Sequence, residues 1–458
     1  MRLWTILAAA AAFVAAPVAV QAEPLVIDHV TIIDGRGNPA QPDSTVIVDG
    51  ERIAWVGPGA APHPTQGRHI DGSGRWLIPG LMDVHIHLDG GFDPTPPRPG
   101  QPPKPPGLNR ATALGALASY IYAGVTSIYD AGNRPELILP LRADERAGKI
   151  ASPRIFATGN LITYPGSHGA AVAVTIDSWP QGKAILDRYL AEQQPDVMKI
   201  TYEEEGWGAR PLIPLLPADL MREIIKEANL HGVRTTIHVS SELRALEAIY
   251  AGTDTLAHPV IQGPVSDSFV KLMGAKRIPF ATTLTIGENY GRLVDHPDYL
   301  DQPIYVASFS PEQRERLRTS VRDEWAKRAW TQWMKVMTPV AMENIRKVDA
   351  AGGIPAAGTD QSSGAALHRE LELLVAAGIT PLEVIRIATY NGALLLGKER
   401  DLGSVEAGKL ADLVMLNADP LRDIDNTLAI AFVMKGGQII DESKLPLAGG
   451  PRPARTPH

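Results

Sequence analysis

Short apolar runs alternate with amphipathic, helix-like segments through the middle of the chain, between about residues 76 and 397. Such runs are typical of buried strands, and their alternation with helices is typical of a parallel sheet built from βα units. Eight strands are predicted, at residues 77–88, 126–130, 154–158, 197–200, 235–238, 255–258, 279–284 and 355–360. Eight units of this kind predict an α/β fold, a closed (β/α)₈ TIM-type barrel. A doubly wound open sheet is the alternative, although no glycine-rich dinucleotide fingerprint follows an early strand.

Helices are predicted most clearly at residues 111–123, 218–230 and 242–250, and another begins at the capping box Thr380-Pro-Leu-Glu383. A second capping box, Ser310-Pro-Glu-Gln313, lies in a long connection over residues 287–337 that is rich in tyrosine and tryptophan. Long insertions are uncommon without a function, so a substrate lid is one interpretation and plain aromatic packing is the other. Residues 89–107 form a second candidate lid, a proline-rich and glycine-rich loop after the first barrel strand.

The two ends of the chain share a different pattern, in which short strand-like runs are separated by glycine turns. We therefore expect residues 23–76 and 402–445 to form one composite β-sandwich domain, which brackets a metal-dependent barrel at residues 77–401. Residues 446–458 are predicted to be a flexible, proline-rich tail.

The first 22 residues predict a secretory signal peptide. Arg2 precedes an alanine-rich apolar stretch, and Val20-Gln21-Ala22 is a small-x-small cleavage site before Glu23. A membrane anchor is the alternative, but cleavage implies an exported protein, periplasmic or secreted, with no stable membrane anchor afterwards.

With no cysteine in 458 residues, the chain has neither disulfides nor thiolate ligands. The net charge of the chain is −7, and the sequence has no basic stripe of the kind that nucleic-acid binding requires. Nucleic acid is therefore not expected as a partner.

His85 and His87 are the clearest candidates for chemistry. They lie two residues apart on a predicted strand, so their side chains project to the same face and can hold one metal ion. The same spacing also occurs in ordinary polar clusters, but here the neighbours are apolar, and two buried imidazoles need a shared partner. The sequence therefore predicts a metal site at this strand.

Four further candidates lie at or near the ends of other predicted strands: Lys199, His238, His258 and Asp360. Each alone has a plain structural explanation, such as a surface lysine, a hydrogen-bonded core histidine or a turn-capping aspartate. Barrel enzymes place their chemistry at the carboxyl ends of the strands, so the joint occurrence of these residues favours one site.

These motifs resemble the amidohydrolase superfamily over nearly the whole mature chain, and in particular its binuclear branch with a carboxylated lysine, which includes prolidase-like and N-acyl amino acid hydrolases. The matching segments are Pro79-Gly-Leu-Met-Asp-Val-His-Ile-His87, Asp196-Val-Met-Lys199, Thr236-Ile-His238, Asp254-Thr-Leu-Ala-His258, Gly358-Thr-Asp360 and Leu402-Gly-Ser-Val-Glu-Ala-Gly-Lys-Leu-Ala-Asp-Leu413. The resemblance implies that one divalent metal is held by His85, His87 and Asp360 and a second by His238 and His258. Lys199, carboxylated by CO₂, would bridge both.

The implied chemistry is hydrolysis of an amide C–N bond in N-acyl amino acids, dipeptides or related small-molecule amides. Two divalent ions can hold a hydroxide and polarise a carbonyl, and Asp360 would act as general acid and base. Zinc is the first expectation, although nitrogen and oxygen ligands also suit manganese, cobalt and iron. We expect Asp83 to orient the strand or a ligand rather than to bind metal.

Substrate contacts are predicted at His168, in the loop Tyr164-Pro-Gly-Ser-His-Gly169 that resembles the family's loop near the scissile bond, and at Tyr202. The three glutamates at residues 203–205 are interpreted as a solvated acidic loop. The sequence leaves open a homo-oligomer, a mononuclear cyclic amidase or deaminase that uses His85, His87, His238 and Asp360, and a non-enzymatic binding or scaffolding protein.

Overall fold

The computed structural model describes residues 23–62, 64, 66–89, 108–205 and 212–451. The predicted signal peptide, nearly all of the loop at residues 89–107 and the last seven residues lie outside this part. Among the helices that are described, none combines the length and the apolar character needed to cross a bilayer.

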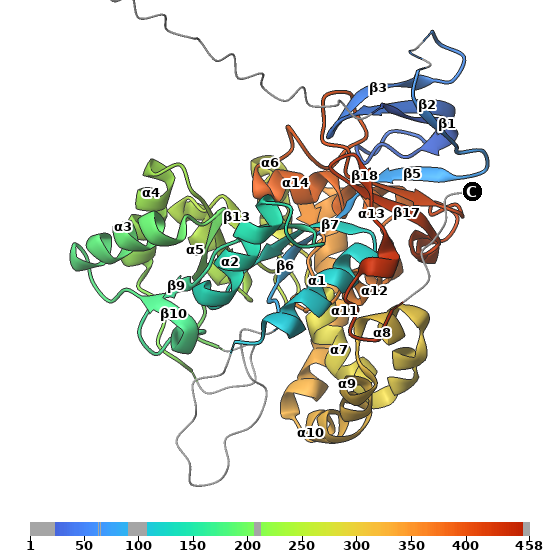
Figure 1. Cartoon of the computed structure of the whole chain (residues 1–458). Coiled ribbons are helices and arrows are strands. Elements are labelled where there is room, and N and C mark those ends of the chain that lie inside the picture. Colours follow the sequence, from blue (N-terminus) through green and yellow to red (C-terminus); the bar gives the residue numbers. More distant parts are fainter. Residues whose placement is uncertain (1–22, 63, 65, 90–107, 206–211, 452–458) are drawn as a thin grey trace, which may run out of the picture.

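Strands from both ends of the chain share one sheet (Figure 1, upper right). Its order is β18-β17-β16-β5-β1-β2-β3, and β4 pairs with β1. The strands are β1 (Leu25–Ile32), β2 (Gln41–Asp49), β3 (Arg52–Pro58), β4 (Arg68–Asp71), β5 (Trp76–Pro79), β16 (Leu413–Leu416), β17 (Ile430–Lys435) and β18 (Gln438–Ile439). Because β5 lies between β1 and β16, it joins the amino-terminal and carboxyl-terminal strands into one continuous mixed sheet. The domain boundaries at residues 76 and 402 stay predictions.

The middle of the chain is α/β, with parallel strands in a seven-stranded and a three-stranded sheet. The first has the order β10-β9-β11-β12-β13-β14-β15 and the second β6-β7-β8. The strands are β6 (Leu81–Ile86), β7 (Val125–Asp130), β8 (Arg154–Ala157), β9 (Leu161–Thr163), β10 (Ala173–Thr175), β11 (Val197–Thr201), β12 (Arg234–His238), β13 (Thr255–Leu256), β14 (Pro279–Ala281) and β15 (Ile354–Ala356). The eight predicted strands are all present, whereas β9 and β10 were missed.

Helices connect these strands, and the three clearest helix predictions are confirmed as α1, α4 and α5. The bounds are α1 (Arg110–Tyr122), α2 (Pro135–Arg146), α3 (Gln181–Gln193), α4 (Ala218–Leu230), α5 (Glu242–Ala251), α6 (Asp267–Lys276), α7 (Leu284–Asp295), α8 (Pro303–Ser308), α9 (Pro311–Arg316), α10 (Arg322–Ala326), α11 (Ala329–Ala350), α12 (Gly364–Ala376), α13 (Pro381–Ile387) and α14 (Tyr390–Leu396). The main hydrophobic core lies between the strands and these helices.

The single strand predicted at residues 77–88 is two strands, β5 in the end sheet and β6 beside the metal-site candidates. Gly80 separates them because the chain passes too close to β7 there for any side chain. A Cβ atom at Gly80 would lie 2.0 Å from the hydroxyl oxygen of Thr126. This crossing places His85 in the parallel sheet and His87 at its end, while β5 stays in the end sheet.

The predicted aromatic connection at residues 287–337 is mostly helical, from α7 to α11 (Figure 1, bottom). Its aromatic side chains pack on one another, with the ring of Tyr290 4.4 Å from Trp325 and 6.0 Å from Trp330. Ser310 caps α9 through the predicted capping box. Aromatic packing is therefore present, and the lid interpretation stays a prediction.

The carboxyl-terminal prediction of a flexible tail from residue 446 is wrong for its first residues. Leu445 and Leu447 are buried against Ala118 and Ile121 of α1 and Ala307 of α8. Burial of these apolar side chains holds the segment on the protein, and the amide of residue 449 also donates to the Ala307 carbonyl.

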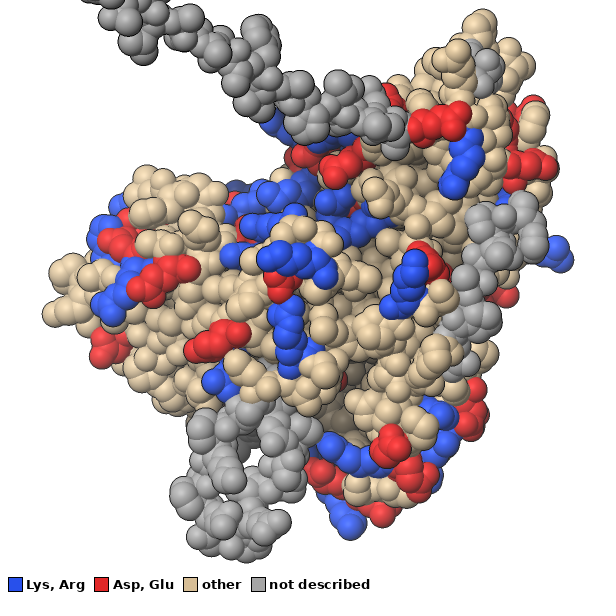
Figure 2. Space-filling model, viewed as in Figure 1, with Lys and Arg blue, Asp and Glu red and all other residues tan. Residues whose placement is uncertain are grey.

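Lysine and arginine side chains gather near β7 and β18, between the end sheet and the parallel sheets (Figure 2). A pocket at this junction contains Arg154 and Lys435 in its lining. Arg154 binds both carboxylate oxygens of Asp412, at 2.6 and 3.0 Å, and Lys435 lies 2.5 Å from Glu145. These cations are therefore compensated by acids and fasten the two parts of the molecule together.

Candidate metal centre

His85 lies in β6 and His87 directly follows it, and their side chains project to the same face, as their spacing predicts. The Nδ1 atom of His85 lies 2.7 Å from the Ala257 carbonyl, and Nδ1 of His87 lies 2.7 Å from the Gly132 carbonyl. A carbonyl oxygen only accepts, so each Nδ1 carries the proton and each Nε2 keeps its lone pair. The two Nε2 atoms are 3.8 and 3.4 Å from one carboxylate oxygen of Asp360. The three side chains thus present ligand atoms within 4.8 Å of one another.

Asp360 follows β15 in a strained backbone conformation. Its φ of +54° lies in the left-handed region that non-glycine residues rarely adopt, and its amide donates to the His85 carbonyl at 2.7 Å. The preceding turn is fixed by Asp83, which accepts hydrogen bonds from the hydroxyl and the amide of Thr359 at 2.7 and 3.0 Å. The backbone strain is typical of a functional position, and Asp83 orients the turn that carries Asp360.

Lys199 is buried on β11, with 2% of its surface exposed. Its Nζ donates to Nε2 of His85 at 3.2 Å. Burial lowers the pKa of Lys199 from 10.5 to about 8, against the opposing attraction of Asp360 and Asp130. The lysine therefore reaches its neutral, nucleophilic form far more readily than an exposed lysine does.

His238 and His258 complete the cluster from β12 and the residues after β13. The His258 ring lies 4.4 Å from His85 and 4.5 Å from His238, measured between ring centroids. Burial, and then the neighbouring His85, lower the pKa of His258 well below 6.5, and burial together with the Lys199 charge does the same to His85. Both rings are therefore neutral, which is the form that binds metal.

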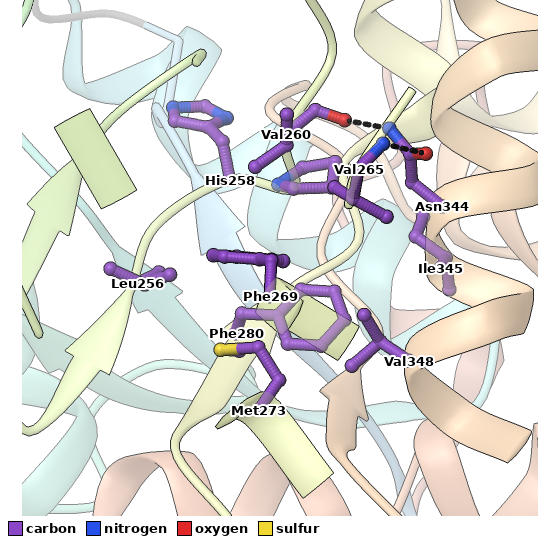
Figure 3. A pocket seen from close by; sticks show the side chains of 11 residues that line it. Leu256, His258, Val260, Val265, Phe269, Met273, Phe280, Asn344, Ile345 and Val348 are labelled. Atoms are coloured by element: carbon purple, nitrogen blue, oxygen red, sulfur yellow. Dashed lines mark hydrogen bonds between the residues drawn. The ribbon is translucent and has the colours of Figure 1, made fainter. Parts of the chain in front are cut away.

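The wall behind His258 is apolar (Figure 3). Leu256, Phe269 and Phe280 line a narrow pocket there, between the strands and the helices α6 and α11. Asn344 of α11 crosses it, donating to the Val260 carbonyl at 2.9 Å and accepting from the Val265 amide at 3.0 Å. Asn344 thus fixes the backbone at Val260 and Val265, after His258, in an apolar environment.

The predicted substrate residues lie in different places. His168 stacks on His238, with ring centroids 4.4 Å apart and planes 15° apart, so it joins the cluster. Tyr202 does not: its hydroxyl donates to Glu247 of α5 at 2.7 Å, and its ring lies in the main core with Ile200, on the helix side of β11.

The interpretation of residues 203–205 as a solvated loop is wrong for Glu203. Glu203 is 1% exposed, and its carboxylate lies 2.6 Å from Nε2 of His238. Glu204 pairs with Arg244. The alternation of side chains along a strand could have predicted the position of Glu203. Lys199, Thr201 and Glu203 project to one face of the strand, whereas the residues between them face the helices.

The donor set suits divalent metal ions, since it combines neutral imidazoles, a carboxylate and a buried amine that CO₂ can convert to a carbamate. The structure brings together all six predicted ligand residues, His85, His87, Lys199, His238, His258 and Asp360, through the contacts above. It also adds Glu203, which sequence reasoning missed.

Comparison with known proteins identifies the family of the chain. An ochratoxinase from Aspergillus niger is 25% identical to the chain over 448 residues, which cover 89% of this chain and 85% of that protein. An imidazolonepropionase from Streptomyces avermitilis is 25% identical over 397 residues, covering 82% and 81%. The crystal structure of a Xaa-Pro dipeptidase with bound methionine matches the fold with a TM-score of 0.71 at 23% identity, over 91% of this chain and 99% of that one. A model of the amidohydrolase family matches residues 76–440, and the chain therefore belongs to that family of hydrolases.

Proposed function

We propose that the chain is an exported hydrolase with two divalent metal ions, and that it cleaves the amide C–N bond of N-acyl amino acids, dipeptides or related small amides. The observation that carries the proposal is the buried Lys199, whose Nζ lies 3.2 Å from His85 and whose pKa falls to about 8. An unmodified lysine is an expensive residue to bury among histidines, whereas a carbamate there is a bridging ligand.

The framework proposed is the closed (β/α)₈ barrel. Two backbone hydrogen bonds support closure, from Val84 of β6 to the carbonyl of Ala357, and from Asp196 before β11 to the carbonyl of Ala157 in β8, at 2.9 and 3.0 Å. Such links would join both edge strands of the three-stranded sheet, β6 and β8, to the seven-stranded sheet, the first beside its edge strand β15 and the second beside β11. The carboxyl ends of the strands, where the candidate ligands lie, would then surround one mouth.

His85, His87 and Asp360 would hold one metal, His238 and His258 the other, and carboxylated Lys199 both. The metals are most simply zinc, and when bound they would supply a Lewis acid and a hydroxide nucleophile at neutral pH. The chain itself provides the proton transfers. Asp360 takes a proton from the attacking water and returns it to the leaving nitrogen. His168, beside His238, steadies the substrate near the scissile bond.

The substrate class draws on the relatives as well as on the site. An ochratoxinase and a Xaa-Pro dipeptidase are among the similar proteins, and the second name denotes hydrolysis of a dipeptide. Export is proposed from the first 22 residues, with a periplasmic or secreted location. The similarity to an imidazolonepropionase favours a second candidate, a cyclic amidase. In that alternative the site would hold one metal and Lys199 would stay unmodified.

The test is a metal count joined to activity. Protein expressed with zinc is analysed for bound metal and for the mass added by CO₂ at Lys199, and is assayed on N-acyl amino acids, dipeptides and cyclic amides. We expect two metals, a modified lysine and loss of activity in Lys199→Ala. Full activity with one metal and an unmodified lysine favours the cyclic amidase, and no hydrolysis of any amide rejects both.

A further inference from the structure

We propose that Glu203 is a positioning residue, which fixes the tautomer and orientation of His238 and thereby sets the affinity of the second metal site. The inference rests on the proposed function only in its need for metal, and it requires no particular amide substrate.

The contacts around His238 support this role. Glu203 is 1% exposed, and its carboxylate lies 2.6 Å from Nε2 of His238. A buried carboxylate is costly unless it is well hydrogen-bonded, so this contact is needed by both partners. On the face of the ring, His168 stacks at 4.4 Å, and its carbonyl accepts a hydrogen bond of 2.8 Å from the hydroxyl of Thr201. The end of β11 therefore holds His238 at both its edge and its face.

The same contact selects the tautomer. A carboxylate only accepts, so Nε2 of His238 carries the proton and Nδ1 keeps the lone pair for a metal. His85 and His87 have the opposite arrangement, because backbone carbonyls accept from their Nδ1 atoms. A carboxylate on the far nitrogen also makes an imidazole a stronger ligand, and loss of such a partner lowers metal affinity by about 10- to 100-fold.

The experiment compares metal binding in wild type, Glu203→Gln and Glu205→Gln. The glutamine at 203 keeps the shape of the side chain but removes its charge, and the substitution at 205 removes the same charge two residues away. Zinc affinities are measured by competition with a chromophoric chelator. We expect Glu203→Gln to weaken the second equivalent of zinc by about 10- to 100-fold and to leave the first unchanged. We expect Glu205→Gln to match wild type.

Two further measurements show that the effect acts through His238. In a His238→Ala background, Glu203→Gln should have no additional effect on zinc affinity. Long-range ¹H–¹⁵N spectra of zinc-loaded protein with labelled histidine should contain one ring with a proton on Nε2 and metal on Nδ1, absent from His238→Ala. Circular dichroism checks the fold, and Glu203→Met replaces the glutamine variant if that one is unfolded.

The outcomes separate the two proposals. Unchanged zinc affinity in Glu203→Gln, or an equal effect in the His238→Ala background, overturns the role of Glu203 and leaves the proposed function standing. The expected binding changes in a protein that hydrolyses no amide support the role of Glu203 and reject the function. A wild-type protein that binds fewer than two zinc ions overturns both.

Discussion

Replacing Lys199 with methionine should make the metal-free protein more stable and the metal-loaded protein inactive. The lysine is 2% exposed, and without metal or CO₂ it is an ammonium group held among the rings of the cluster. Methionine has a similar length and carries no charge, so it imitates the neutral form of the lysine. The substitution therefore removes the cost of the buried charge and, at the same time, the group that would bridge the metals.

The size of the effect follows from the pKa. Burial lowers the pKa of Lys199 from 10.5 to about 8. Each pKa unit corresponds to about 1.4 kcal/mol, so the charged lysine makes the folded state about 3 kcal/mol less stable relative to the unfolded state. The whole penalty is present below pH 8. It declines as the pH rises from 8 to 10.5, because there the unfolded chain binds the proton and the folded chain does not.

The assay is urea unfolding of metal-free protein in CO₂-depleted buffer, at intervals from pH 7 to pH 10. We expect Lys199→Met to exceed wild type by about 3 kcal/mol near pH 7, and the difference to shrink toward pH 10. Lys226→Met is the matched control, because the Lys226 side chain is 65% exposed. It should stay close to wild type throughout. A Lys199→Met protein that is less stable than wild type, or a constant difference at every pH, would refute the reasoning.

Three other changes test the contacts around the site. Tyr202→Phe should lower the free energy of unfolding by about 1 kcal/mol and leave kcat/KM for the best amide unchanged, since the lost hydrogen bond goes to Glu247 on the helix side of β11; a large loss of activity contradicts this placement. Gly80→Ala should cost about 1 to 3 kcal/mol in urea unfolding, because its Cβ would overlap Thr126; wild-type stability contradicts the close approach. Ser310→Ala removes the cap of α9 and should cost about 1 kcal/mol, and an unchanged unfolding midpoint shows that the cap contributes nothing.

Much of the fold follows from local patterns. The eight strands that alternate with helices were predictable because each is a short apolar run between turn signals. The strands β9 and β10 have three residues each, too few to establish a period. The break at Gly80 depends on the nearby Thr126, some 46 positions along the chain, and no local pattern records such an approach.

The candidate site divides in the same way. His85, His87 and the four other predicted ligand residues were visible because strand ends meet at one edge of a parallel sheet. Glu203 was missed because a run of three glutamates is ordinarily solvated, and only its buried contact with His238 distinguishes it. Tyr202 was predicted on the side of the strand that faces the site, but it lies on the side that faces the helices. It is an odd number of residues from Lys199, so the alternation of side chains along a strand already places the two on opposite faces.

Several features of the cluster make the metal-free folded state less stable. Asp360 and Thr283 both have positive φ, at +54° and +35°, and each contacts a histidine of the cluster. Left-handed backbone at a non-glycine residue costs on the order of 1 to 2 kcal/mol, and the buried ammonium of Lys199 adds its own cost. The chain has no cysteine, so disulfides cannot offset these penalties. CO₂ would remove the lysine charge, and metal would bind Asp360 directly and His258, the neighbour of Thr283, so occupation of the site should stabilise the folded chain as well as activate it.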